Sequence, residues 1–217
     1  MLDIMLLFDH ADQYMQGLRN TLLASVIALM GSFMIGTIIA VLRLTPIKLL
    51  RGIGTAYVEF FRNIPLLLTV YIFFLGLPAL GLILNGFVSG TLGLMIYTSA
   101  YIAEAIRAGI MAVPKGQSEA ARSSGLSYMQ TMRHILLPQA IKIVVPPISN
   151  QFLNLVKNSS ILGVVSGFDL MFYADIVNSE TYQTVNALFI AALLYLLLTI
   201  PLSYLTRLLE KRLASTG

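Results

Sequence analysis

The sequence predicts an all-α membrane protein with one domain, residues 1–217, and five transmembrane helices. Apolar residues make up 57% of the chain and charged residues 11%, whereas soluble domains carry roughly 25% charged residues. The mean hydropathy is +0.82. Five apolar runs are each long enough to cross a bilayer as a helix, in which the backbone groups bond within the segment. The runs are 21–42, 64–84, 90–112, 140–164 and 185–205, joined by connections 43–56, 85–89, 113–139 and 165–184.

Local signals support the individual runs. The first run carries Ser32 and Gly36, small residues four apart that permit close helix packing. The second is followed by the Asn-Gly turn signal at 85–86 and the third by the Pro-Lys-Gly sequence at 114–116. In the fourth run, the two prolines at 146–147 predict a loosened or kinked helix. The residues before the first run have no basic n-region and no evident cleavage site, so we expect the first helix to direct insertion.

The distribution of Lys and Arg predicts how the chain is oriented. One side of the membrane would hold all basic residues except Arg19, on the other side, and Lys157, inside a run. Because cytoplasmic loops are enriched in Lys and Arg, we expect the amino terminus outside and the carboxyl terminus and the connection 113–139 in the cytoplasm of a bacterial cell. This bias explains the pI near 9.4 without a nucleic-acid partner. The cytoplasmic set is Arg43, Lys48, Arg51, Arg62, Arg107, Lys115, Arg122, Arg133, Lys142, Arg207, Lys211 and Arg212, and the acidic residues Asp3, Asp9, Asp12, Asp169, Asp175 and Glu180 lie opposite.

The connection 113–139 carries the most specific pattern in the chain. It has Glu-Ala-Ala at 119–121, Gly125 after three more residues, and Ile-x-Leu-Pro at 135–138. This pattern resembles the coupling loop of permease subunits of bacterial ABC importers. The segments 59–66, 101–109 and 138–153 are similar to the polar amino acid branch of that family, and the resemblance spans residues 18–210.

The resemblance implies a type I ABC importer permease fold that moves a polar amino acid by alternating access. It also implies a pair of permeases, identical or related, surrounded by membrane lipid. Two ABC ATPase subunits would dock on the loop 113–139, and an extracytoplasmic solute-binding protein would deliver the substrate. ATP and Mg²⁺ would be held by the ATPase, and this chain, which lacks a P-loop sequence, would bind no cofactor.

The loop 113–139 is expected to form two short helices separated by Gly125, which suits a left-handed break. We expect Ser118 to cap the first helix and Glu119 to lie in its first turn. Pro138 would be tolerated in the first turn of the fourth membrane helix. The alternative is a loop that merely lies on the lipid headgroups. The predicted ATPase-coupling residues are Glu119, Ala120, Ala121, Gly125, Ile135, Leu137 and Pro138.

Lys157 is a basic residue that falls inside the fourth apolar run, away from its cytoplasmic end. A lysine at the centre of a membrane helix costs roughly 2.5–3.5 kcal/mol on insertion scales, so it should face protein or water. Helical spacing places several amide and hydroxyl side chains near it, and this stripe suits an amino acid substrate. Hydrogen bonding between helices is the alternative. The predicted substrate-path residues are Asn150, Asn154, Lys157, Asn158 and Ser159.

Acid–arginine pairs at spacing i, i+3 lie on one helix face. The pairs near the cytoplasmic ends of spans would form a gate, brace the coupling loop, or neutralise charge at the headgroups. On the outer side, three acids would meet basic residues of a delivery protein or be simply solvated. The pairs are Glu59/Arg62, Glu104/Arg107 and, in the coupling loop, Glu119/Arg122; the outer acids are Asp169, Asp175 and Glu180.

The residues argue against an enzyme. His10 and His134 are the two histidines and lie far apart, no carboxylate cluster for Mg²⁺ falls within a run, and the absence of cysteine excludes thiol chemistry and disulfides. An ion-coupled secondary amino acid carrier is the alternative function, although five spans without inverted repeats favour the importer. Since Lys157 suits an anionic or neutral polar substrate, glutamine or glutamate is favoured.

Overall fold

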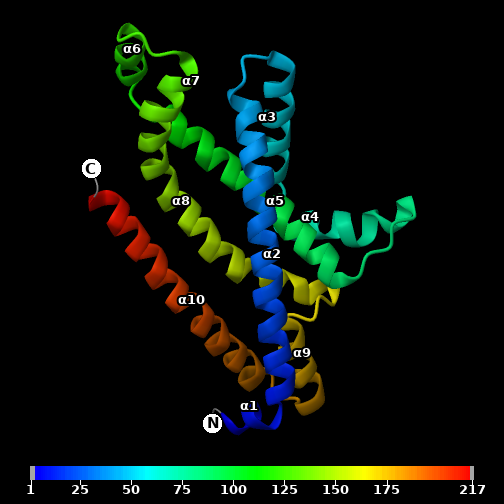
Figure 1. Ribbon diagram of the computed structural model, residues 1–217. Helices are drawn as coiled ribbons and strands as arrows, with labels where there is room; N and C mark the ends of the chain where they lie inside the picture. The colour runs from blue at the N-terminus through cyan, green and yellow to red at the C-terminus, as the bar shows by residue number, and fades with distance from the viewer. Residues whose placement is uncertain (1–2, 216–217) are drawn as a thin grey trace.

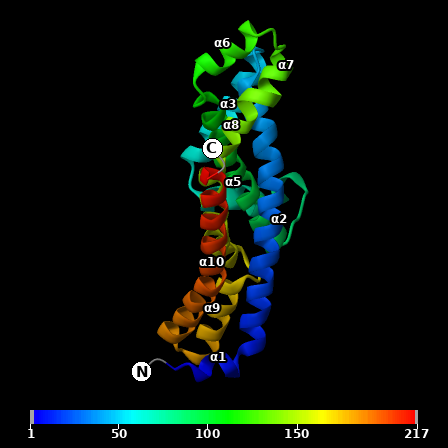
Figure 2. The ribbon, with the colours of Figure 1, turned by 60° about the vertical axis from the view of Figure 1, so that its left-hand side comes forward.

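The computed structural model describes residues 3–215, and every regular element in that range is helical. The bundle is elongated (Figures 1 and 2): α2 runs along it, α6 and α7 lie at one end, and α1 and α9 lie at the other. The elements are α1 Met5–Asp9, α2 Ala11–Leu44, α3 Lys48–Asn63, α4 Leu66–Tyr71, η1 Ile72–Gly76, η2 Pro78–Leu80, α5 Gly86–Met111, α6 Lys115–Ser123, α7 Tyr128–Thr131, η3 Met132–Leu136, α8 Leu137–Asn158, η4 Ser159–Val165, α9 Leu170–Thr181 and α10 Thr184–Ser215.

Three of the predicted spans are single helices. α2, α5 and α10 correspond to the first, third and fifth apolar runs and are long and apolar enough to cross a membrane. The other two candidate spans are helix pairs that bend at a short break. The bend is 112° between α3 and the segment from α4 to η2, and 48° between the segment 128–165 and α9. With each bent pair counted as one span, the chain has the five spans that the sequence predicts.

The predicted course of the second span is wrong. α3 already begins within the predicted connection 43–56, and the chain turns sharply at Ile64 and Pro65, which are both extended. Proline disfavours the helical conformation of the residue before it, so the helix ends there. Beyond the turn, α4, η1 and η2 run sideways away from α3 (Figure 1) until Gly81, at φ 82°, ends the 3₁₀ turn. The apolar run 64–84 is therefore not a single straight helix.

The fourth predicted span also differs in detail. α8 is helical through Pro146 and Pro147, so these residues do not end the helix. The irregular turns lie instead at the two ends of α8, where η3 is a π-helix and η4 a 3₁₀-helix. The predicted connection 165–184 contains α9, a helix of 12 residues that is too short to be recognised as a span.

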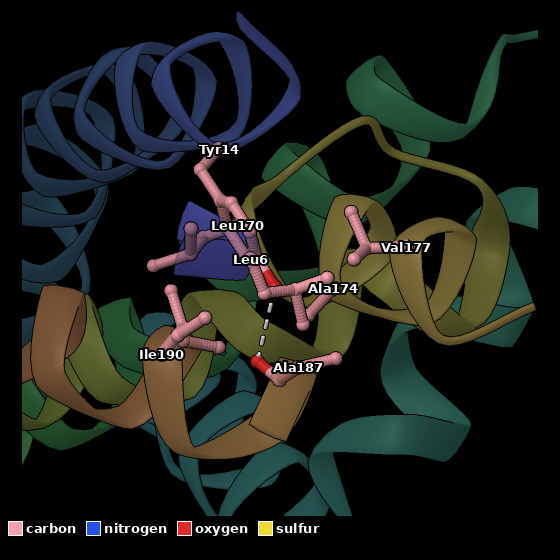
Figure 3. Close-up of a cluster of buried hydrophobic side chains, with 8 residues drawn as sticks. Leu6, Tyr14, Leu170, Ala174, Val177, Ala187 and Ile190 are labelled. Atoms are coloured by element: carbon pink, nitrogen blue, oxygen red, sulfur yellow. Dashed lines mark hydrogen bonds between the residues drawn. The ribbon is translucent and has the colours of Figure 1, made fainter. Parts of the chain in front are cut away.

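A buried cluster holds α1, α2, α9 and α10 together at one end of the bundle. Tyr14 is 1% exposed, and its hydroxyl donates a hydrogen bond to the carbonyl oxygen of Ala187 at 3.3 Å (Figure 3). In the same close-up Leu6, Leu170 and Ile190 converge around the tyrosine ring. The partly exposed helix α1 is thus anchored by apolar burial, the main favourable contribution to packing.

Small residues let α2 and α5 approach closely, as Ser32 and Gly36 predict. A Cβ atom on Gly36 would lie 2.8 Å from the carbonyl oxygen of Ser99 in α5. In the same way, α2 approaches α9 at Gly17, where a Cβ atom would lie 2.8 Å from the Cα of Leu170. Within its most apolar stretch, α5 is 61% buried, whereas α10 is 17% buried. α5 is therefore the central helix, and the apolar outer surface of α10 suits contact with lipid or a further membrane subunit.

Candidate coupling and translocation sites

The predicted coupling loop forms two short helices at one end of the bundle (Figure 2). Gly125 separates them with φ 86°, the left-handed conformation that the sequence predicts. Ser127 then opens α7 with a capping box: its hydroxyl accepts from the backbone N–H of Gln130 at 3.3 Å, and the Gln130 side chain accepts from the backbone N–H of Ser127 at 2.8 Å. The expected cap by Ser118 is wrong, because α6 begins at Lys115 and Glu119 lies beyond its first turn.

The exposed surface of the coupling loop combines small, charged and large apolar side chains. Glu119 and Ala120 are exposed, while Ala121 is buried against the chain at 8% exposure. Tyr128 and Met129 are 67% and 69% exposed. Tyr128 and Met129 thus offer an apolar surface beside the charged side chains of α6.

The coupling loop is continuous with α8. α7 passes through the π-turn η3 into α8, so Pro138 lies near the start of α8 but not at the start of the whole helical segment. The side-chain amide of Gln139 donates to the carbonyl oxygen of Ile135 at 2.8 Å and to the side chain of Gln117, on α6, at 3.4 Å. Leu137 is exposed and Ile135 is half-buried. α7, η3 and α8 thus form one continuous helical segment, and Gln139 links it to α6.

A charged cluster joins α2 to α5 near the same end. Glu104 accepts hydrogen bonds from Arg107, at 2.7 Å, and from Nη1 of Arg43. The Arg43 side chain is 8% exposed, and its stem packs against Gly54 of α3, where an added Cβ would lie 2.8 Å from the Arg43 Cγ. The Glu104/Arg107 pair is present as the spacing indicates. The sequence analysis missed Arg43 as the third member of this cluster, although a basic residue directly after the first apolar run is a signal for such a contact.

The other two predicted ion pairs are wrong. Among residues 3–215, no salt bridge joins Glu59 to Arg62 or Glu119 to Arg122. The amide of Asn63 donates to the Glu59 carboxylate at 3.2 Å and to its carbonyl oxygen at 2.7 Å.

The environment of Arg62 differs from the one predicted. Its guanidinium carbon lies 5.3 Å from the centre of the Tyr101 ring, a cation–π geometry. Because Tyr101 lies well inside α5, Arg62 is deeper in the bundle than the cytoplasmic end where the sequence placed it.

The stripe around Lys157 is present in part. Asn150, Asn154 and Lys157 are exposed on α8, and Asn158 is half-buried. A groove of about 250 Å³ lies beside Lys157, between α8 and α10, and is lined by Leu153, Lys157, Thr199, Ile200 and Ser203. Ser159 does not belong to the stripe. It is 0% exposed and donates to the carbonyl oxygen of Val156 at 2.7 Å, because the helix tightens to 3₁₀ there and turns this side chain inward.

Asp169 cannot contact a delivery protein, which corrects the prediction for the outer acidic loop. It is 0% exposed. Its carboxylate caps α9 by accepting from the backbone N–H groups of Met171, at 3.2 Å, and Phe172, at 3.1 Å, and it also accepts from the Tyr195 hydroxyl at 3.2 Å. The sequence pattern Asp followed by an apolar helix is a capping signal, and Asp169 holds α9 against α10. Asp175 and Glu180 are exposed.

The chain is a multi-pass helical bundle with paired short helices at one end and charged side chains within its spans. This architecture is typical of membrane transport subunits. The chain belongs to the family described as binding-protein-dependent transport system inner membrane component, whose model matches residues 32–215.

Two further comparisons agree with the family, and a third with its fold. The Bacillus subtilis (strain 168) protein named "Probable glutamine ABC transporter permease protein GlnM" is 62% identical over 212 residues, which are 98% of each chain. A chain in the crystal structure of an amino acid ABC transporter with histidines is 35% identical, with a TM-score of 0.92 over 98% of this chain and 99% of that one. A chain of the MetNI methionine ABC transporter in an inward-facing conformation has a TM-score of 0.78 at 21% identity over 94% of this chain and 98% of that one, which supports the type I permease fold alone.

Proposed function

We propose that this chain is the permease subunit of an ATP-driven ABC importer that moves a polar amino acid, preferably glutamine, into the cytoplasm. One observation carries the proposal: the exposed helices α6 and α7, broken at Gly125, display the coupling pattern and continue without interruption into α8, which bears Lys157. The names of the relatives support amino acids as the substrate class.

The positions of α6 and α7 and of the basic residues support an orientation of the chain in the membrane. With α6 and α7 in the cytoplasm, the basic residues Arg43, Arg107 and Arg122 lie on the cytoplasmic side, as the enrichment of Lys and Arg in such loops favours. An ABC ATPase would contact Glu119 and the exposed side chains of α7, and would hold ATP and Mg²⁺ itself. The opposite end, with α1 and α9, would receive an extracytoplasmic binding protein.

The mechanism is a rigid-body switch. Closure of two ATPases would draw α6 and α7 together, and the continuous helix would carry this motion to α8 and its polar stripe. The charged cluster of Arg43, Glu104 and Arg107 would keep α2 and α5 aligned during the motion, because breaking a partly buried pair leaves an uncompensated charge.

A second permease copy or a paralogue would complete the path. The segment 72–85 supports this: Leu80 is 77% exposed and Ile83 86% exposed. Among the described residues, the backbone N–H groups of Ile83 and Leu84 have no hydrogen-bond partner. Irregular backbone within a membrane is tolerated only where protein or water covers it, and a second permease would provide the cover.

The test uses the complex reconstituted in liposomes with its ATPase and binding protein. Gly125→Val should leave the complex assembled but separate ATP hydrolysis from uptake, because a branched side chain cannot adopt the left-handed conformation without strain. Lys157→Ala should lower uptake of glutamine while leaving ATPase assembly intact. Uptake that continues without any ATPase would favour the ion-coupled carrier, and transport of histidine but not glutamine would reverse the substrate preference.

A further inference from the structure

Glu59 and Arg62 carry charges that are exposed within the depth of the membrane span. Both lie in the last turns of α3 and are exposed. The ring of Tyr101, over which the Arg62 guanidinium lies, is ten residues before the end of α5 at Met111. At 1.5 Å per residue the ring is about 15 Å inside that helix end. Arg62 is therefore not at the headgroup boundary.

These two charges do not neutralise each other. Within residues 3–215, Arg62 makes no hydrogen bond or ion pair through its guanidinium, and its recorded partner is the Tyr101 ring. The Glu59 carboxylate accepts from the Asn63 amide and from no cation. Uncompensated charges at this depth are costly unless they face a water-filled path and a ligand of matching charge. An ammonium and a carboxylate on one small molecule would satisfy both.

We propose that Arg62 binds the α-carboxylate and Glu59 the α-ammonium of the transported amino acid. The guanidinium fork matches a carboxylate in geometry, the Tyr101 ring holds the fork in place, and Asn63 positions the Glu59 carboxylate. The i, i+3 spacing sets both groups on one face of α3. This site deepens the proposed importer function and rests on it. It recognises what all amino acids share, and leaves the choice of side chain to other residues.

The site is separate from the groove beside Lys157. Leu155, two residues before Lys157, packs against Leu94 of α5, and Leu94 is seven residues before Tyr101. This spacing corresponds to about 10 Å along α5. With α6 and α7 in the cytoplasm, Lys157 lies nearer the outer side and Arg62 nearer the inner side, so the substrate would pass Lys157 first.

The experiment measures equilibrium binding of labelled glutamine and histidine to the purified permease–ATPase complex without its binding protein. Arg62→Gln should weaken binding roughly tenfold to hundredfold, the range for a hydrogen bond to a charged group. Arg62→Lys should retain part of the affinity. The matched control is Arg51→Gln, an exposed arginine on the same helix, which should bind as the wild type does. Unlabelled glutamine should displace the label, whereas its α-carboxamide should not.

A second variant tests the support of the guanidinium. Tyr101→Leu removes the ring face and should weaken binding about threefold to tenfold, whereas Tyr101→Phe keeps the ring and should not. Wild-type affinity in Arg62→Gln, or displacement by the α-carboxamide, would overturn the site while leaving the importer function intact. The site would also be overturned by a wild-type complex that shows ATP-driven uptake but binds neither glutamine nor histidine. Absence of ATP-driven uptake in the wild type would instead overturn the proposed function.

Discussion

Replacement of Asp169 by alanine should destabilise the protein more than replacement of any exposed acid on α9. The buried carboxylate accepts two backbone N–H groups at the start of α9 and the hydroxyl of Tyr195 on α10. Alanine removes all three hydrogen bonds together. It leaves the two backbone N–H groups at the start of α9 without their acceptor.

The size of the effect follows from these contacts. Loss of a helix cap costs about 1–2 kcal/mol, and a buried polar group left without its partner costs about 1–3 kcal/mol. The total is about 2–5 kcal/mol, and in a chain of this length such a loss corresponds to a fall in Tm of about 4–20 °C. Asp169→Asn keeps an acceptor oxygen of the same shape and should lose less than Asp169→Ala.

Thermal unfolding of the purified complex in detergent, followed by the loss of monodisperse protein on size-exclusion chromatography, measures this difference. Asp175→Ala is the matched control, because Asp175 lies on the same helix and is exposed. Its Tm should stay close to that of the wild type. Equal Tm values for Asp169→Ala and Asp175→Ala would refute the capping argument.

Three further substitutions test other parts of the structure, two by thermal unfolding and one by ATP-driven uptake in liposomes. Gly17→Ala should destabilise the protein by about 1–3 kcal/mol, because the backbone at the start of α9 lies against Gly17. The control Gly52→Ala, on an open face of α3, should be neutral or slightly stabilising. Equal effects of the two substitutions would contradict the close packing. Gly125→Ala should lower the coupling of ATP hydrolysis to uptake, and Gly116→Ala, which has no left-handed backbone and no close neighbour, should not. Glu104→Gln should lower Tm by several degrees because it leaves two guanidinium groups facing each other, and an unchanged Tm would show that the cluster does not brace the helices.

Much of the fold could be predicted from the sequence because the bilayer imposes a length on every span. α2, α5 and α10 follow from apolar runs of sufficient length. The length and composition of an apolar run do not indicate the direction in which its helix runs. The turn at Ile64 and Pro65 was therefore not predicted, nor was the sideways course of α4. Pro65 was a local signal for that turn, because proline disfavours a helical conformation of the residue before it. α9 was missed because it has 12 residues, too few for a span.

In the candidate sites, features set by a single residue were predictable, and contacts between distant residues were not. Gly125 was predicted correctly because the left-handed conformation is a property of the residue itself. Contacts between distant residues were not predictable: Arg43 reaches Glu104 from another helix, and Arg62 faces Tyr101 instead of Glu59. Asp169 was grouped with the exposed acids Asp175 and Glu180, and its burial depends on the backbone N–H groups of α9 that it caps.

The exposed segment 72–85 has a consequence for biogenesis. A newly inserted copy that has not met a companion would offer its apolar tip and its unbonded amide groups to any membrane chaperone or protease nearby. Orphan subunits should therefore be short-lived in the cell, and the quantity of this protein would be set by the rate at which its companion is synthesised.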